Sequence, residues 1–152
     1  MDHRHYRAPG RLSRMLNPLV VALVQRGRLP GATAVLAVPG RVSGRERTVP
    51  LTPVTVGGRR YLISPRGETD WVLNLRAAGG RAELRAGAVT DPVLAMEQSP
   101  VTAVPVLRAY LDGLGRSAGL LFDDIGPGSS DAEITAAAHR HPVFELCAPR
   151  AG

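Results

Sequence analysis

Glycine and proline divide the middle of the chain into segments that are too short for most helices. The run from Thr33 to Val38 is apolar throughout and lies between Pro30-Gly31 and Pro39-Gly40. An apolar run of this length between turn residues is typical of a buried strand. Further along, Gly57-Gly58 marks a two-residue hairpin turn. Successive strands joined by such tight turns predict an antiparallel sheet.

The remaining pattern predicts strands interrupted by short helices. Strands are expected at Thr33–Val38, Arg47–Val56, Arg59–Ser64, Arg81–Ala86, Ala88–Met96 and Val143–Leu146. Helices are expected from Asp70 to Gly79, over Val101–Leu114 and over Asp131–Ala138, with a loop over residues 115–130. The alternation in the second strand slips at Thr52-Pro53, which indicates a bulge or bend. Roughly six strands with flanking helices predict an α+β, mainly β fold built as a small antiparallel barrel.

The charge of the chain is unevenly placed. All 19 basic residues are arginines, against 13 acidic residues, for a formal net charge of +6. Residues 41–85 contain nine arginines and four acidic residues, whereas residues 86–152 contain four and eight. This asymmetry predicts an anionic partner near the first half of the chain.

Composition excludes several classes of site. Six aromatic residues are too few for a protein that stacks RNA bases, and the acidic second half argues against any nucleic-acid partner. A single cysteine, Cys147, excludes an internal disulfide and a cysteine-based zinc site. The pairs His3/His5 and His139/His141 lack acidic partners at metal-binding spacing, so we expect surface histidines and no metal.

The N-terminal region is expected to differ from the rest: a basic arm over residues 1–17, followed by one domain over residues 18–152. Asn17-Pro18 is a helix-start signal, and the apolar run Leu19–Val24 follows it. We expect this helix to dock on the domain's own core; the alternative is peripheral contact with a membrane. No run reaches the ~20 apolar residues that span a bilayer. We therefore expect a cytoplasmic protein, membrane-associated if the alternative holds.

The segment from Gly40 to Arg47 is the most informative motif. Its two glycines permit backbone angles that gather N–H groups into an anion-binding nest, and Ser43 adds a hydroxyl. Arginine side chains in the same segment grip phosphate or carboxylate groups in a bidentate way. The alternative is a charged hairpin whose arginines lie in solvent. Pro50, which donates no N–H, either leaves neighbouring amides of its strand partly unpaired or places that strand at a sheet edge.

Two motifs in fixed order resemble the deazaflavin-dependent nitroreductase family, which is common in actinobacteria. The first is Gly40-Arg41-x-Ser43-Gly44-x-x-Arg47-Thr48-x-Pro50-Leu51. The second is Trp71-Val72-x-Asn74-Leu75, with Ala77-Ala78-Gly79 close behind. The ending His141–Leu146 is also similar to C-termini of that family. The resemblance implies a split β-barrel that binds coenzyme F420, an 8-hydroxy-5-deazaflavin with a phosphate and a polyglutamate tail, rather than FMN or FAD.

The resemblance also implies which residues form the coenzyme site. The phosphate and tail would contact Arg41, Val42 and Ser43; the ring would lie on Arg47, Thr48, Val49, Pro50, Leu51 and Thr52, with Ile63, Ser64, Pro65 and Arg66 beside it; and Asp70, Trp71, Val72, Leu73 and Asn74 would close the phosphate and ribityl side. Members of the family often have Lys or Arg where this chain has Val42. A lone tryptophan on a short amphipathic helix is more often a core residue than a ligand contact, and Trp71 could be both.

The activity implied is transfer of a hydride between reduced deazaflavin and an electron-poor acceptor, which is a quinone, nitro compound or activated alkene. Tyr110, Ser64 or water could supply a proton, although Tyr110 is better explained as a core tyrosine. The alternative function is a non-catalytic protein that binds a cofactor or a lipid on the same fold. We expect a monomer or a homodimer.

Overall fold

The computed structural model describes residues 34–149. Seven strands form one antiparallel sheet in the order β2-β1-β5-β6-β7-β4-β3. They are β1 (Ala34–Pro39), β2 (Glu46–Leu51), β3 (Val54–Val56), β4 (Arg59–Ile63), β5 (Arg81–Ala86), β6 (Val89–Glu97) and β7 (Val143–Cys147). The helices are α2 (Asp70–Ala77), α3 (Pro100–Leu114), α4 (Ala118–Leu121) and α5 (Asp131–Ala137), with 3-10 turns η1 (Gly115–Ser117) and η2 (Ala138–Arg140). This confirms the α+β, mainly β, split-barrel class. The expected arm over residues 1–17 and helix from Pro18 lie outside the described residues.

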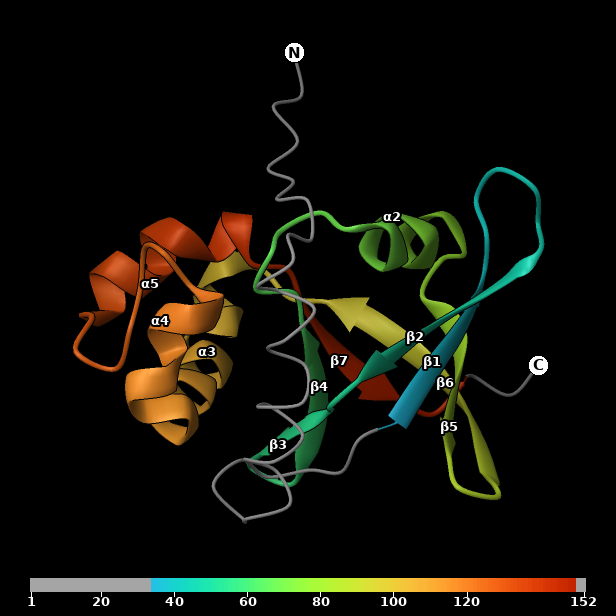
Figure 1. Ribbon diagram of the computed structural model, residues 1–152, viewed down its shortest axis with the longest axis horizontal. Coiled ribbons are helices and arrows are strands. Elements are labelled where there is room, and N and C mark those ends of the chain that lie inside the picture. Colours follow the sequence, from blue (N-terminus) through green and yellow to red (C-terminus); the bar gives the residue numbers. More distant parts are fainter. Residues whose placement is uncertain (1–33, 150–152) are drawn as a thin grey trace.

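The segment expected as one long strand, Arg47–Val56, is two strands at opposite edges of the sheet. β2 pairs with β1, whereas β3 pairs with β4. Thr52-Pro53 joins the two edges, so the slip in alternation marks a strand that leaves one edge and enters the other. Because only these two residues separate the edges, the sheet curls into a half-barrel (Figure 1).

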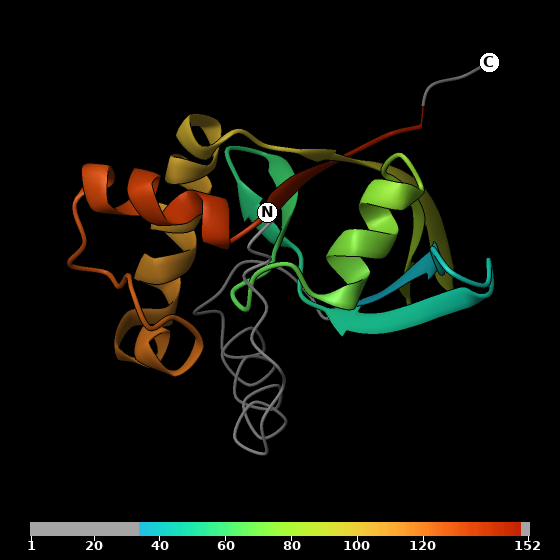
Figure 2. The ribbon, with the colours of Figure 1, turned by 90° about the horizontal axis from the view of Figure 1, so that it is seen from above.

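The curled sheet has a hydrophobic core on each side. Helix α2 packs on one side, where Val72 and Leu75 meet Leu36 of β1 and Phe144 of β7. The other helices gather on the opposite side of the molecule, away from α2 (Figures 1 and 2). There α3, α4 and α5 pack against Val54, Tyr61, Ile63 and Val143 of β3, β4 and β7. We call residues 100–140 the helical lobe.

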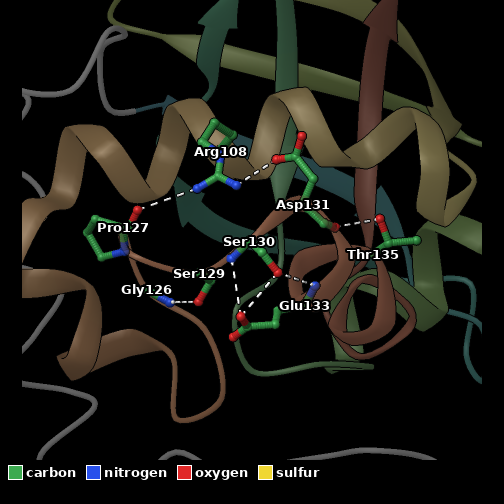
Figure 3. A network of polar contacts seen from close by, with 8 residues as sticks. All are labelled: Arg108, Gly126, Pro127, Ser129, Ser130, Asp131, Glu133 and Thr135. Atoms are coloured by element: carbon green, nitrogen blue, oxygen red, sulfur yellow. Dashed lines mark hydrogen bonds and ion pairs between the residues drawn. The ribbon is translucent and has the colours of Figure 1, made fainter.

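The expected loop over residues 115–130 contains a short helix, and the lobe is held together by caps and ion pairs. Ser130 and Glu133 form a capping box: the Ser130 hydroxyl accepts from the Glu133 amide at 3.1 Å, and the Glu133 carboxylate accepts from the Ser130 amide at 3.4 Å. Arg108 of α3 donates to Asp131 at 2.6 Å and so joins α3 to α5 (Figure 3). Within residues 34–149, no helix is long and apolar enough to cross a membrane.

Candidate functional site

A cavity of about 510 Å³ lies between the β1–β2 hairpin and the N-terminal half of α2. Its walls come from two segments of the sequence, residues 38–49 of the hairpin and residues 66–74 around the start of α2. The lining residues are Val38, Gly40, Arg41, Val42, Ser43, Arg47, Thr48, Val49, Arg66, Thr69, Asp70, Trp71 and Asn74. The two sequence motifs singled out above therefore face the same space.

The hairpin turn at residues 40–45 is fixed by its own hydrogen bonds. The Gly40 amide donates to the Arg45 carbonyl at 2.7 Å, and the Gly44 amide donates to the Gly40 carbonyl at 2.9 Å. Gly44 has a φ of 73°, where other residues are strained. A Cβ on Gly40 would lie 3.0 Å from the Arg45 carbonyl oxygen. The first glycine thus permits a close approach, and the second supplies the left-handed turn.

Arg41 ties the hairpin to α2. Its backbone amide and its Nη1 both donate to the Asn74 Oδ1, at 3.1 and 2.7 Å, and its Nη2 donates to Asp70 at 3.2 Å. Asn74 is only 5% exposed and is held on the inner side of α2. These contacts fix the width of the cavity, and they occupy much of the hydrogen-bonding capacity of Arg41.

Two arginines in the cavity wall have no acidic partner. Most arginines in the described part of the chain make ion pairs, as Arg76 does with Glu97 at 2.7 Å. Among residues 34–149, no ion pair or hydrogen bond involves the side chain of Arg47 or Arg66, both of which line the cavity. Uncompensated guanidinium groups of this kind can accept an anion.

The wall also has an apolar part. Val38 and Val49 come from the paired strands β1 and β2, and Trp71 comes from the first turn of α2. Trp71 is 7% exposed, with its ring centroid 5.8 Å from that of Phe144. It is therefore both a core residue and part of the cavity wall. A flat apolar ring fits such a surface.

The structure brings ten of the eighteen expected coenzyme-site residues to the cavity. They are Arg41, Val42, Ser43, Arg47, Thr48, Val49, Arg66, Asp70, Trp71 and Asn74. The other eight do not line it: Pro50, Leu51, Thr52, Ile63, Ser64, Pro65, Val72 and Leu73. Pro50 is exposed on edge strand β2, and Val72 is buried on the side of α2 that faces the sheet. Within α2, side chains rotate around the helix axis, so Asp70, Trp71 and Asn74 line the cavity while Val72 and Leu73 point elsewhere.

Sequence reasoning missed Val38 and Thr69 as lining residues, whereas Gly40 lines the cavity as part of the segment expected to form an anion-binding nest. Thr69 stands at the N-cap position of α2, but its hydroxyl makes no cap hydrogen bond. It is 7% exposed, and its closest polar contact is with the Ser64 hydroxyl at 3.5 Å. Ser64 instead donates to the Gly67 carbonyl at 2.6 Å and stabilises the loop between β4 and α2.

The Tyr110 side chain of α3 is buried in the core that the helical lobe forms with β4, not at the cavity. Its ring meets Phe122 edge-on at 6.0 Å. Burial raises the pKa of Tyr110 to about 12, so the hydroxyl keeps its proton. Cys147, the lone cysteine, is half-buried at the end of β7.

The expectation of a surface position for His141 is wrong. The residue is 3% exposed, and its ring nitrogens contact Pro65 and Asp124. The two-residue spacing between His139 and His141 could not indicate this burial, because the residues that His141 contacts come from distant segments of the sequence. Within the described residues, no group of three or more histidine, cysteine or acidic side chains is placed to hold a metal ion.

The comparison with protein families decides the assignment. Residues 15–108 match the model of the family described as F420H(2)-dependent quinone reductase. The chain belongs to this family. It is therefore an F420-dependent oxidoreductase with coenzyme F420 as its cofactor, which confirms the resemblance seen in the two motifs. No curated protein matches the chain significantly.

Solved structures share the fold of this family member at low identity. A structure described as an F420-H2 dependent reductase is 18% identical, with a TM-score of 0.51 over 76% of this chain and 93% of the other. A protein described as a domain-swapped dimer is 17% identical, with a TM-score of 0.52 over 86% and 98%. A conserved hypothetical protein of Mycobacterium tuberculosis is 14% identical, with a TM-score of 0.52 over 95% and 86%. At these identities the likeness concerns the fold alone.

Proposed function

We propose that the cavity between the β1–β2 hairpin and α2 is the coenzyme F420 site, and that the enzyme reduces a quinone there. The observation that carries this proposal is the pairing of two wall types in one space. Arg47 and Arg66 supply unpaired positive charge, while Val38, Val49 and Trp71 supply an apolar surface. The coenzyme has the matching parts, namely an anionic phosphate and tail and a flat ring system.

The described residues also meet the requirement of space. A volume of about 510 Å³ lies within the ~300–1,000 Å³ of ordinary ligand pockets. The cavity is open rather than enclosed, so a long tail could extend over the hairpin, where Arg45 is exposed and has no ion pair within residues 34–149. Val42, 93% exposed at the hairpin tip, contributes no charge to this route.

The residues of the cavity bind, orient and exclude water. Bound coenzyme supplies the hydride chemistry through its deazaflavin ring. Arg47 and Arg66 hold the anionic groups, while Arg41 keeps the hairpin at a fixed distance from α2 through Asn74. Val38, Val49 and Trp71 present an apolar face that keeps water from the ring and leaves its other face to the acceptor. Of the expected proton sources, Tyr110 lies in the core and Ser64 does not line the cavity, which leaves water.

A turnover assay tests the function. The purified protein is mixed with reduced coenzyme and a soluble naphthoquinone or a nitroarene, and reoxidation is followed by the return of deazaflavin absorbance. We expect quinone-dependent reoxidation at a rate proportional to protein concentration. Coenzyme binding without turnover over the whole acceptor panel would instead favour the non-catalytic alternative.

We also propose that residues 18–152 form one domain, as monomer or homodimer. The two cores of the described part share strands β4 and β7, which supports a single unit. Light scattering on the purified chain measures its mass in solution and decides between monomer and dimer. Contact of the expected N-terminal helix with a membrane stays a prediction, which co-sedimentation with anionic vesicles tests.

A further inference from the structure

His141 joins three segments that are far apart in the sequence. Its Nδ1 lies 2.9 Å from the carbonyl oxygen of Pro65, in the loop between β4 and α2. Its Nε2 lies 2.9 and 3.1 Å from the two carboxylate oxygens of Asp124, in the helical lobe. The His141 side chain is 4% exposed, so water does not compete for these contacts. The ring thus connects the helical lobe to the loop that precedes α2.

Both partners of the ring accept hydrogen bonds and cannot donate them. The Pro65 partner is a carbonyl, and Asp124 is ionised. Partial burial acts to raise the pKa of Asp124, but hydrogen bonds from Arg140 and the neighbouring His141 hold it below its ordinary value. Burial lowers the pKa of His141, and the neutral ring carries one N–H. Because the Pro65 carbonyl can only accept, the 2.9 Å contact is a hydrogen bond when that proton is on Nδ1, and a substitute side chain must supply a donor there.

The Pro65 carbonyl lies directly before a residue of the cavity wall. Arg66 follows it in the chain, and its side chain lines the cavity without an ion pair in the described part of the protein. No salt bridge holds that guanidinium in place, so its position depends on the backbone of the loop. Within residues 34–149, His141 makes the one side-chain hydrogen bond to Pro65.

We propose that His141 is a positioning residue for the coenzyme site, which holds the Pro65 carbonyl and so keeps the Arg66 side chain at the cavity wall. The proposal rests on the assignment of the cavity to the coenzyme. The proposal assigns the helical lobe a role at the coenzyme site, because Asp124 of this lobe holds the His141 ring in place. His141 and Asp124 both lie beyond the residues matched by the family model.

Two substitutions separate the contacts of the ring. In His141→Asn the amide nitrogen can occupy the place of Nδ1 and donate to Pro65. In His141→Gln it can occupy the place of Nε2 and donate to Asp124, leaving Pro65 without a donor. Both variants are uncharged, and both lose the edge-on contact of the ring with Phe122 at 4.9 Å. They form a matched pair that differs in the partner retained.

The test measures hydrogen exchange over residues 64–69 in the coenzyme-free protein and the dissociation constant for coenzyme F420. We expect His141→Asn to stay close to the wild type in both measurements. We expect His141→Gln to exchange faster in this segment and to bind coenzyme roughly two- to tenfold more weakly, the range for one hydrogen bond. In an Arg66→Ala background the two variants should bind coenzyme equally.

Equal exchange and equal affinity in the two variants would overturn the proposal, as would faster exchange in His141→Gln with unchanged affinity. Should both fold poorly, Asp124→Asn weakens the anchor of the ring without removing it, and the same faster exchange and weaker binding are expected. Failure of the wild type to bind coenzyme would refute the site assignment instead, while the exchange contrast would still report on the Pro65 contact.

Discussion

At the scale of single residues, arginines of the same cavity have different tasks. Arg41 is engaged by Asn74 and Asp70, so its guanidinium holds the hairpin against α2. Arg47 and Arg66 have no such partner within residues 34–149 and are free to bind an anion. From the sequence, all three arginines are candidate ligands. The spacing of a motif cannot show which of its guanidinium groups forms an ion pair with an acidic side chain from another part of the chain.

Replacing Asn74 by alanine should uncouple the hairpin from α2. The buried carbonyl of Asn74 accepts two hydrogen bonds from Arg41, so its loss should lower the free energy of unfolding by about 1–3 kcal/mol. The matched control is Asp70→Ala, which removes an exposed partner of the same arginine and should cost less than about 1 kcal/mol. Urea unfolding of both variants checks the order, and equal losses would contradict it.

Tyr110→Phe should leave hydride transfer unchanged and alter the response to alkali. Burial raises the pKa of Tyr110 to about 12 in the folded protein, above its ordinary value of 10.0. The unfolded chain therefore ionises first, and stability is lost as pH rises from about 10 towards 12. The variant lacks this loss, so unfolding curves taken over that pH range should diverge from those of the wild type. A large fall in turnover at neutral pH would instead place Tyr110 in the chemistry.

At the scale of elements, the connection from α2 to β5 sets the position of the helix over the sheet. Gly79 and Gly80 both have positive φ, at 66° and 84°. A Cβ on Gly80 would meet the Ala95 carbonyl oxygen at 2.2 Å, whereas a Cβ on Gly79 would meet nothing within 4 Å. The Gly80 carbonyl also accepts from the Ala95 amide at 2.8 Å. Helix α2 is thus fastened to β6 immediately after it ends.

The two glycines therefore make a controlled pair of substitutions. Gly79→Ala should cost about 1–2 kcal/mol, because it adds only the strain of a left-handed backbone. Gly80→Ala adds a clash with the backbone of β6 and should cost at least about 3 kcal/mol. Thermal unfolding of the two proteins measures the difference. Similar unfolding temperatures of the two variants would contradict the close approach of the Gly80 backbone to the Ala95 carbonyl of β6.

Most elements could be predicted from the sequence, because apolar periodicity and Gly-Pro punctuation are local signals. The strand over Arg81–Ala86 has the predicted bounds, and α3 begins one residue earlier than predicted. The division of residues 46–56 between two sheet edges could not be predicted, since pairing partners are a property of the whole sheet. The buried site of His141 was missed for the same reason, as its partners lie 17 and 76 residues away.

At the scale of the whole molecule, the curled sheet separates binding from support. One side carries α2, and the other carries the helical lobe (Figure 2). The cavity lies on the side of α2, between this helix and the β1–β2 hairpin. Strands β4 and β7 contribute side chains to both cores, so they connect the packing of the helical lobe with the packing beneath α2. The basic first half and acidic second half of the chain follow this division, because the cavity arginines all come from residues 41–66.

The central claim is that unpaired arginines in this cavity hold the anionic part of coenzyme F420. A fluorescence titration with the coenzyme, run on the wild type, on Arg47→Ala/Arg66→Ala and on the control Arg116→Ala, tests it most directly. Arg116 is exposed in the helical lobe and also makes no ion pair within residues 34–149, so the control removes a similar charge far from the cavity. Loss of two charge-assisted contacts should weaken binding at least about a hundredfold in the double variant, with Arg116→Ala close to the wild type. Unchanged affinity in the double variant, or an equal loss in the control, would contradict the account.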